Sequence, residues 1–363
     1  MKDKLRIGFD VSPLYSGHKV RGVGFYTERL VKEIVKLPNY QIVEIKNSDD
    51  VRTKKYDILH IPYFHPFFFT VPFKKKRPII VTIHDLIPIK YPGHYPPGIK
   101  GKIRWEIQKI LLRKNVDFII TDSFASKYDI TDLTGYPQDR IYPIYLAADN
   151  KFEKLSAKSY QLKAVKNKYN LPDTFVLYVG DVNWNKNLPG LVKACEKIKI
   201  PLVVVGKQAA TDDFTKKHIE NRDLVWLQKR AGVWKSEIGS SGSLSLLGFV
   251  STSDLVAIYN LATVYCQPSF DEGFGLPILE AFACGCPVVS SDAGSLPEIA
   301  KDVASVVKPT VKELARAIKK IIDDKALGDK LKLRGYKRVK DFSWEKTAKK
   351  TMFVYRLARE KNL

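Results

Sequence analysis

The sequence contains few cysteines and none of the spacings that a zinc site or a disulfide framework needs. Its 363 residues include four cysteines, Cys195, Cys266, Cys284 and Cys286, and the last two form a C-x-C pair rather than a C-x-x-C pair. Structural zinc sites use closely spaced pairs of cysteine or histidine ligands, and small disulfide scaffolds are much richer in cysteine. We therefore expect four reduced, mostly buried thiols of a cytosolic protein.

The sequence also lacks a long apolar run. No segment approaches the ~20 apolar residues of a transmembrane helix. The first residues, MKDKLRIGFDV, turn into a strand pattern without the apolar stretch of a signal peptide. A hydrophobic content of 45% and a mean hydropathy of −0.20 are typical of a soluble globular enzyme. We expect a cytoplasmic protein. A further expectation is that it attaches peripherally to the inner face of the cell membrane.

Acidic residues are scarce relative to basic ones. There are 39 Asp and Glu against 61 Lys and Arg, which gives a formal net charge of +22. Such an excess attracts polyanions, namely nucleic acid, an anionic membrane surface or acidic substrates. Lysine is spread along much of the chain, so a lysine-rich genome composition explains much of the excess equally well. Two local concentrations, at residues 67–77 and 100–114, stand apart from this spread.

These two basic segments make an anionic membrane surface a candidate partner. Residues 67–77, FFFTVPFKKKR, join aromatic residues to a run of four charges. Residues 100–114 carry six basic residues and one acid, and Ile103, Ile107, Ile110 and Leu111 recur at helical spacing. This second segment is either a basic amphipathic helix that lies on a membrane or a domain helix that buries its Ile and Leu side chains. An exposed FFF run would mark an interaction site.

Short β-rich runs alternate with helical patterns throughout, which predicts a parallel α/β architecture. The expected strands are Leu5–Val11, Gln41–Ile45, Asp57–Ile61, Ile79–Ile83, Phe118–Thr121, Ile141–Tyr145, Phe175–Val179, Leu202–Val205, Leu244–Leu247, Thr263–Gln267, Pro287–Ser291 and Ala304–Val307. The pattern restarts after the polar stretch 150–174. We expect two doubly wound, Rossmann-like domains, 1–165 and 166–343, facing each other across a cleft, and a final helix, 344–363, that crosses back to the first.

The segment 270–287, FDEGFGLPILEAFACGCP, carries the most specific chemistry. Glu272 and Glu280 are separated by seven residues, and Pro277 and Gly285 suit the first position of a helix and the residue after its end. Unpaired N–H groups near Gly275 and Leu276 would then attract an anion, notably a phosphate. An anion site between two carboxylates that can bind hydroxyl groups suits a nucleotide-sugar, with its diphosphate in the middle.

Two further segments of the second half fit a nucleotide-sugar site. In the first, a strand ends at Gly180 and a loop carries Asn185 and Lys186 into the next helix, where a lysine can reach a diphosphate as a point charge. The second is the turn Gly248-Phe249-Val250 at the end of a predicted strand.

A second group of candidate ligand-binding residues lies in the first half of the chain. Gly22 and Gly24, between the first strand and the first helix, allow close approach of the backbone to a ligand. His84 and Asp85 follow the apolar strand Ile79–Ile83, and Ser123 ends another strand. A neutral imidazole at position 84, with an ordinary pKa near ~6.5, could orient a sugar hydroxyl.

Together these segments resemble the retaining glycosyltransferases of the GT-B fold, family 4. The resemblance rests on E-x7-E within EGFGLPILEAFACGCP, on T-I-H-D-L at residues 82–86, on GFV at 248–250 and on GSLPE at 294–298. At Asn185 the family usually has Arg, and at Trp184 it usually has Pro. This departure leaves Lys186 as the main expected cationic contact for the diphosphate.

The resemblance implies a hexosyltransferase of polysaccharide biosynthesis that keeps the anomeric configuration by a same-face displacement. It assigns His84, Lys186 and Glu272 to catalysis. It assigns Asn185, Phe274, Gly275, Leu276, Glu280 and the 248–250 turn to the donor, and Gly22, Gly24, Asp85 and Ser123 to the acceptor or reaction-centre loop. The implied partners are a nucleotide-sugar and a glycan or lipid-linked acceptor, with no cofactor and no metal.

Two other enzyme classes and one non-enzyme class remain as alternatives. A nucleotide-sugar epimerase or a sugar phosphorylase would share the architecture, and an epimerase would need no acceptor. A basic nucleic-acid-binding protein would bind with a steep salt dependence. That last alternative leaves the E-x7-E segment unexplained, and no nucleic-acid motif accompanies the charge. The residues do not specify the sugar, the base, the acceptor or the oligomeric state, although T-I-H-D-L and G-V-G-F-Y together favour a mannosyl or rhamnosyl donor slightly.

Overall fold

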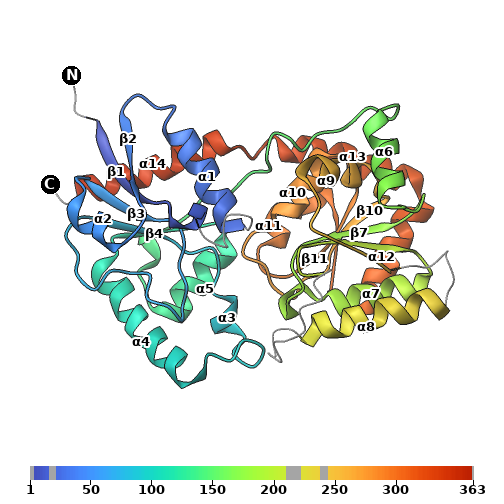
Figure 1. Ribbon diagram of the computed structural model, residues 1–363, viewed down its shortest axis with the longest axis horizontal. Helices are drawn as coiled ribbons and strands as arrows, with labels where there is room; N and C mark the ends of the chain where they lie inside the picture. The colour runs from blue at the N-terminus through green and yellow to red at the C-terminus, as the bar shows by residue number, and fades with distance from the viewer. Residues whose placement is uncertain (1–3, 16–21, 210–221, 238–243, 362–363) are drawn as a thin grey trace. The chain divides into compact units, whose positions relative to one another are not determined.

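The computed structural model describes residues 4–15, 22–209, 222–237 and 244–361, and the chain forms two compact units (Figure 1). The first unit comprises Met1–Leu146 and Phe342–Leu363, and the second comprises Ala147–Asp341. The boundary between the two units, after Leu146, thus falls earlier in the chain than the boundary at 165 expected from the sequence. The reason is packing: the Phe152 ring lies 5.9 Å from the Tyr259 ring, and the Leu155 N–H donates to Asn260 Oδ1 at 2.8 Å.

The first unit is built on a six-stranded parallel sheet in the order β2-β1-β3-β4-β5-β6. Its strands are β1 Leu5–Asp10, β2 Tyr40–Ile45, β3 Ile58–Ile61, β4 Ile79–Thr82, β5 Phe118–Thr121 and β6 Ile141–Pro143. Its helices are α1 Gly22–Ile34, α2 Ser48–Thr53, α3 Ile87–Lys90, α4 Gly98–Asn115, α5 Phe124–Thr134 and α14 Trp344–Glu360. All residues of β3, β4 and β5 are buried, as expected for parallel strands covered on both faces.

The C-terminal helix α14 belongs to the first unit, where it packs against α1 and the middle of the sheet. A buried polar network fixes it there. His60 Nδ1 lies 2.6 Å from Tyr355 Oη of α14, and His60 Nε2 lies 2.8 Å from Thr82 Oγ1. Tyr26 Oη of α1 also contacts Thr82 Oγ1, at 2.9 Å. Burial lowers the pKa of His60 to about 3, so the ring is neutral and takes part as one donor and one acceptor.

The second unit contains another six-stranded parallel sheet, in the order β12-β11-β10-β7-β8-β9. Its strands are β7 Val176–Val179, β8 Leu202–Val205, β9 Leu244–Gly248, β10 Val264–Gln267, β11 Val288–Ser291 and β12 Ser305–Val307. Its helices are α6 Tyr160–Lys168, α7 Leu188–Ile198, α8 Arg222–Glu237, α9 Thr252–Leu261, α10 Leu276–Ala283, α11 Leu296–Ala300, α12 Val311–Asp323 and α13 Lys325–Val339.

The predicted architecture of parallel α/β sheets is confirmed, and each expected strand occurs within two residues of its predicted ends. The four cysteines are free and buried, also as expected. Helix α10 ends as predicted: Gly285 has φ +70°, and the N–H groups of Gly285 and Cys286 donate to the carbonyls of Phe282 and Ala281. Pro277 occupies the second helical position, one residue later than expected, because α10 begins at Leu276.

Candidate functional site

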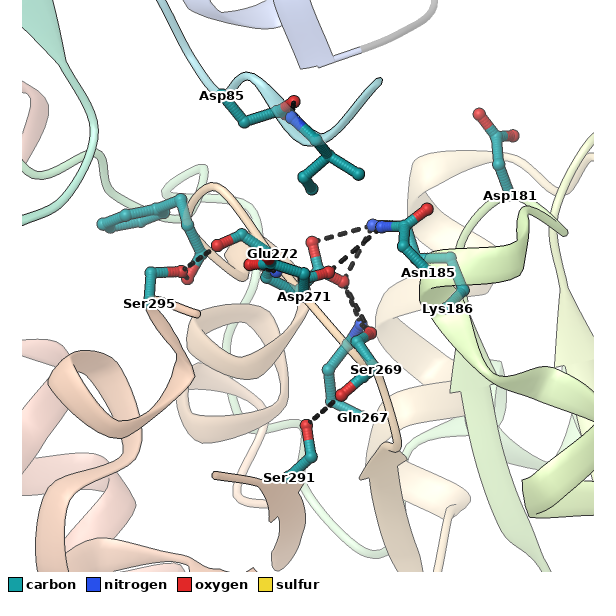
Figure 2. Close-up of polar contacts among 12 residues, drawn as sticks. Asp85, Asp181, Asn185, Lys186, Gln267, Ser269, Asp271, Glu272, Ser291 and Ser295 are labelled. Atoms are coloured by element: carbon teal, nitrogen blue, oxygen red, sulfur yellow. Dashed lines mark hydrogen bonds and ion pairs between the residues drawn. The ribbon is translucent and has the colours of Figure 1, made fainter. Parts of the chain in front are cut away.

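Glu272 is the centre of a buried polar cluster in the second unit (Figure 2). It lies between β10 and α10 and is only 7% exposed. Lys186 Nζ lies 2.8 Å from both of its carboxylate oxygens. Gln267 Nε2 and Ser269 Oγ donate to Glu272 Oε1 at 2.6 and 2.8 Å. Buried carboxylates need such partners, and this set holds Glu272 in one orientation.

The loop around Glu272 is fixed to neighbouring segments through its backbone. Asn185 is buried, its Nδ2 donates to the Asp271 carbonyl at 3.0 Å, and its own carbonyl accepts from the Phe270 N–H at 2.7 Å. The N–H and Oγ of Ser295 donate to the Glu272 carbonyl at 3.1 and 3.0 Å. Asn185 therefore positions the Glu272 loop.

Glu280 lies on α10 in a very different environment. Tyr259 Oη donates to Glu280 Oε2 at 2.9 Å. Burial raises the pKa of Glu280 to about 7, and the hydrogen bond from Tyr259 offsets only part of this effect. The two carboxylates of the E-x7-E segment therefore differ: Glu272 has a cation in contact, whereas Glu280 has a neutral donor.

The start of α10 is a tight glycine turn. Gly275 precedes the helix with φ +102°, and a Cβ there would lie 2.7 Å from Leu296 Cδ2, so only glycine fits. The first amides of a helix have no acceptor within the helix. Phe274 and Gly275 are buried and Leu276 is partly exposed. These residues place backbone N–H groups one helical turn before Glu280.

The 248–250 turn follows β9 and exposes an aromatic ring. Gly248 has φ +66°, Val250 is buried, and Phe249 is 70% exposed. The Gly248 carbonyl accepts from the Gly206 N–H at 3.0 Å, which fixes this turn to the end of β8. The exposed ring offers a face on which a flat ligand could stack.

In the first unit, His84 is paired with a carboxylate that the sequence analysis did not single out. His84 Nδ1 lies 2.7 Å from Asp122 Oδ2, and His84 Nε2 lies 3.1 Å from the Pro62 carbonyl. Both partners are acceptors, so both ring nitrogens carry protons. Burial alone would lower the pKa of His84, but the Asp122 carboxylate more than offsets it and the pKa is raised.

This geometry corrects the expectation of a neutral imidazole at position 84. Both ring nitrogens lie against acceptors of the protein, and the raised pKa favours the charged ring over the neutral one. The signal that could have identified Asp122 was its place at the end of β5, next to β4 in the sheet, because the carboxyl ends of neighbouring parallel strands lie together. Asp122 Oδ1 is buried and has no hydrogen-bond partner among the described residues.

The remaining acceptor candidates occupy structural positions. Gly22 and Gly24 lie in the first turn of α1 rather than in a loop, which corrects that expectation, and Val20 and Arg21 of the same segment lie outside the described residues. Ser123 caps α5 by accepting from the Ser126 N–H at 3.0 Å. Asp85 Oδ1 accepts from the Ile87 N–H at 3.1 Å. Helix formation and capping explain these residues without a ligand.

A cavity of about 640 Å³ lies in the first unit, beside the residues that contact His84. Tyr63, which follows the His84 partner Pro62, is part of its wall. Buried apolar residues form much of the lining, including Ile45, Leu59 and Ile61. The lining also includes five basic residues: Lys46, Arg52, Lys74, Lys76 and Arg77. An apolar wall combined with several cations suits a ligand that is partly apolar and partly anionic.

Within 4–15, 22–209, 222–237 and 244–361, no helix is long and apolar enough to cross a membrane. In those same ranges, no group of three or more His, Cys, Asp or Glu side chains is arranged to hold a metal ion.

Known families and proteins resemble the chain over most of its length. Residues 160–338 match the family model described as glycosyl transferases group 1, and residues 17–152 match the model of glycosyltransferase family 4. The chain is 30% identical over 318 residues to the O-antigen chain mannosyltransferase B of Escherichia coli, covering 85% of this chain and 76% of that protein. It is 25% identical over 378 residues to the uncharacterized glycosyltransferase MJ1607 of Methanocaldococcus jannaschii, covering 99% and 90% of the two chains.

Solved structures resemble the chain at lower identity. A sucrose-phosphate synthase from Thermosynechococcus elongatus gives a TM-score of 0.73 at 20% identity, over 98% of this chain and 99% of that one. Anabaena HepE, solved with UDP and glucose, also gives 0.73, at 16% identity and over 97% and 99% of the chains. The TM-scores establish that these proteins share the fold of this chain.

Proposed function

This chain belongs to glycosyltransferase family 4 and has the GT-B fold, and we propose that it transfers mannose from a nucleotide-diphosphate sugar to a hydroxyl of a glycan or lipid-linked glycan, with retention of configuration. The observation that carries the donor part is the Glu272 carboxylate, held by Lys186, Gln267 and Ser269 next to the start of α10. This arrangement combines a cation, the start of a helix and a fixed acceptor of hydroxyl protons. A sugar-diphosphate presents the complementary groups.

In this proposal Lys186 and the Leu276 N–H at the start of α10 contact the diphosphate, because Pro277 has no N–H and the Ile278 N–H donates to the Gly275 carbonyl at 3.0 Å. Negative charge grows on the leaving phosphate as its bond to the sugar breaks, and both groups stabilise that charge. Glu272 accepts hydrogen bonds from the sugar hydroxyls. The acceptor hydroxyl attacks the face from which the phosphate departs, and a phosphate oxygen takes up the acceptor proton. No side chain of the protein forms a bond to the sugar in this route.

Glu280 and Phe249 are proposed to hold the nucleoside. The Glu280 carboxylate accepts hydrogen bonds from the ribose hydroxyls, and Tyr259 keeps it oriented at 2.9 Å. The exposed Phe249 ring, with the adjacent Gly248 backbone, lies against the base. Stacking on an aromatic ring tolerates every base, so this contact is compatible with either a purine or a pyrimidine donor.

Mannose is proposed because relatives that share sequence over much of the chain are named mannosyltransferases. The test is a panel of GDP-mannose, UDP-glucose and dTDP-rhamnose, each incubated with the protein without an acceptor. We expect GDP-mannose to raise the midpoint of thermal unfolding most, since a ligand that binds the folded state stabilises it, and to be hydrolysed slowly to GDP. A larger response to either other donor would overturn the choice of sugar, and isomerised donor without release of nucleotide would favour the epimerase alternative.

The acceptor is proposed to bind in the cavity of the first unit. Its apolar wall and the cations Lys74, Lys76 and Arg77 suit a lipid-linked glycan, which carries both a hydrocarbon chain and phosphate. Tyr63 of its wall follows Pro62, whose carbonyl lies 3.1 Å from His84 Nε2. The fixed imidazolium then positions the acceptor through its ring edge and the nearby backbone, because its N–H groups are already bonded.

The raised pKa of Glu280 predicts that nucleotide binding depends on pH. With a pKa of about 7, this carboxyl is about one tenth ionised at pH 6 and about nine tenths ionised at pH 8. The ionised form is the better acceptor for ribose hydroxyls. We therefore expect the Kd of free nucleoside diphosphate, measured by calorimetry, to fall about five- to tenfold between pH 6 and pH 8.

Glu280→Gln is the control, because the ligand phosphate also titrates near pH 6. The ratio of the two proteins' Kd values cancels that contribution. The free energy of unfolding of the unliganded proteins changes with pH in the opposite direction. A carboxyl whose pKa is raised in the folded state contributes less to stability as pH rises through about 7. The wild-type protein should thus become less stable relative to Glu280→Gln between pH 6 and pH 8. Parallel binding curves for the two proteins would contradict the ribose role.

A further inference from the structure

Helix α4 of the first unit has an apolar stripe that faces away from the core. Ile99, Ile103 and Ile110 are 80%, 57% and 55% exposed. At about 100° per residue, the three side chains lie within about 40° of one another on the helix. The buried side of α4, which includes Trp105, Gln108 and Leu112, is nearly opposite. The reading in which this helix buries its Ile and Leu side chains holds for Leu111, whereas Ile103 and Ile110 point outward.

Basic side chains border this isoleucine stripe on both sides. Lys102 and Arg113 lie on one side, Lys100 and Lys114 lie on the other, and all four are exposed. The face carries one acid, Glu106, which pairs with Lys109 at 2.8 Å. The arrangement is an apolar line with cations along its edges, over a helix of 18 residues that is about 27 Å long.

The body of α4 is held firmly, so this face is preformed. Gln108 is fully buried, and its Nε2 donates to the carbonyls of His65 and Phe68, both at 2.6 Å. Asn115 Nδ2 donates to the Pro72 carbonyl at 2.7 Å. These bonds also hold the neighbouring loop, in which Phe68 is 60% exposed and lies under the Arg104 guanidinium. The isoleucines therefore face outward because the opposite side of the helix is committed to the core.

We propose that this isoleucine stripe and its bordering cations dock the protein on an anionic phospholipid bilayer, with α4 lying in the plane of the interface. Lysine and arginine stems can extend along apolar surface while their charged ends reach lipid phosphates. Each such cation near an anionic bilayer strengthens binding about fivefold. Charge complementarity thus favours lipid over a protein partner. In addition, one narrow stripe is much smaller than the roughly 800 Å² per partner that a stable protein interface buries.

The test is flotation of the full chain with vesicles of phosphatidylcholine containing 30% phosphatidylglycerol, without nucleotide or acceptor. We expect binding at low salt that weakens as salt is added, and none to pure phosphatidylcholine. Lys102→Ala/Lys114→Ala should reduce partitioning about ten- to thirtyfold, and Ile103→Ser/Ile110→Ser about tenfold. Because no donor is present, failure here would leave the transferase proposal intact.

Matched variants on the second unit separate local docking from diffuse attraction by the net charge. Lys330→Ala/Lys337→Ala on α13 removes the same charge, and Leu333→Ser/Tyr160→Ser removes exposed apolar surface. Both should bind vesicles like the wild type, and all four variants should keep its thermal midpoint. Equal loss in the Lys330→Ala/Lys337→Ala variant would overturn the proposal, as would absence of binding at low salt. A fall in solution mass of Ile103→Ser/Ile110→Ser, without loss of vesicle binding, would assign the stripe to self-association instead.

Discussion

Replacing Lys186 with alanine is expected to slow sugar transfer about ten- to a hundredfold at saturating donor, because a charge-assisted hydrogen bond to the leaving diphosphate contributes about 1.5–3 kcal/mol. The variant also leaves the buried Glu272 carboxylate without its cation, although Gln267 and Ser269 still donate to it. The loss should appear mainly in kcat, since the charge on the phosphate is greatest in the transition state. Initial rates with saturating GDP-mannose and acceptor measure it.

Lys308→Ala provides the control for Lys186→Ala. Lys308 also pairs with a carboxylate, Asp292, at 2.6 Å, but its side chain is 74% exposed, so its removal should leave the rate unchanged. A second test combines Lys186→Ala with Glu272→Gln. Residues that act on one substrate as a pair should show strongly non-additive losses. Transfer at the wild-type rate by Lys186→Ala would remove this lysine from the site.

The second large effect is expected for Gly294→Ala, which changes no group that the proposed donor would touch. Gly294 has φ +55°, and a Cβ there would lie 2.4 Å from Asp271 Oδ1 and 2.6 Å from the Glu272 carbonyl oxygen. The loop must shift to accept a methyl group, and the backbone conformation adds strain of about 1–3 kcal/mol. We expect a comparable loss of unfolding free energy in urea and more than a tenfold loss of transfer, because Glu272 moves with the loop.

Gly93→Ala is the matched substitution for Gly294→Ala. A Cβ at Gly93 would meet nothing within 4 Å, so both the urea midpoint and the rate should stay near the wild-type values. If Gly294→Ala were destabilised yet transferred sugar at the normal rate, the position of the Glu272 loop would not govern catalysis. That result would contradict the role proposed here for the loop.

The sequence predicted the fold closely because most inner strands of both sheets are buried on both faces. Strands such as β4 and β8 are runs of apolar residues that fit neither an exposed strand nor a surface helix. The conformation of the segment 270–287 was equally predictable, since Gly275 and Gly285 adopt the positive φ values that mark the two ends of α10. Local conformation and burial determine these features, and both leave their pattern in neighbouring residues.

Features that depend on packing between distant segments were not predictable. The pairing of Lys186 with Glu272 joins residues 86 positions apart, and that of His84 with Asp122 follows from the adjacency of β4 and β5. Helical spacing placed Ile103, Ile110 and Leu111 on one apolar face. Spacing alone does not show which part of a broad apolar face packs against the sheet. The raised pKa of His84 could not be predicted without knowing both hydrogen-bonding partners of the ring.

The attachment of α14 to the first unit has a consequence for synthesis of the protein. The second unit is one continuous segment, Ala147–Asp341, inserted between the two parts of the first. Until Tyr355 emerges from the ribosome, His60 Nδ1 lacks its buried partner. Because domains fold as units during translation, the segment that emerges second can complete its core first. The first unit therefore finishes folding after the second.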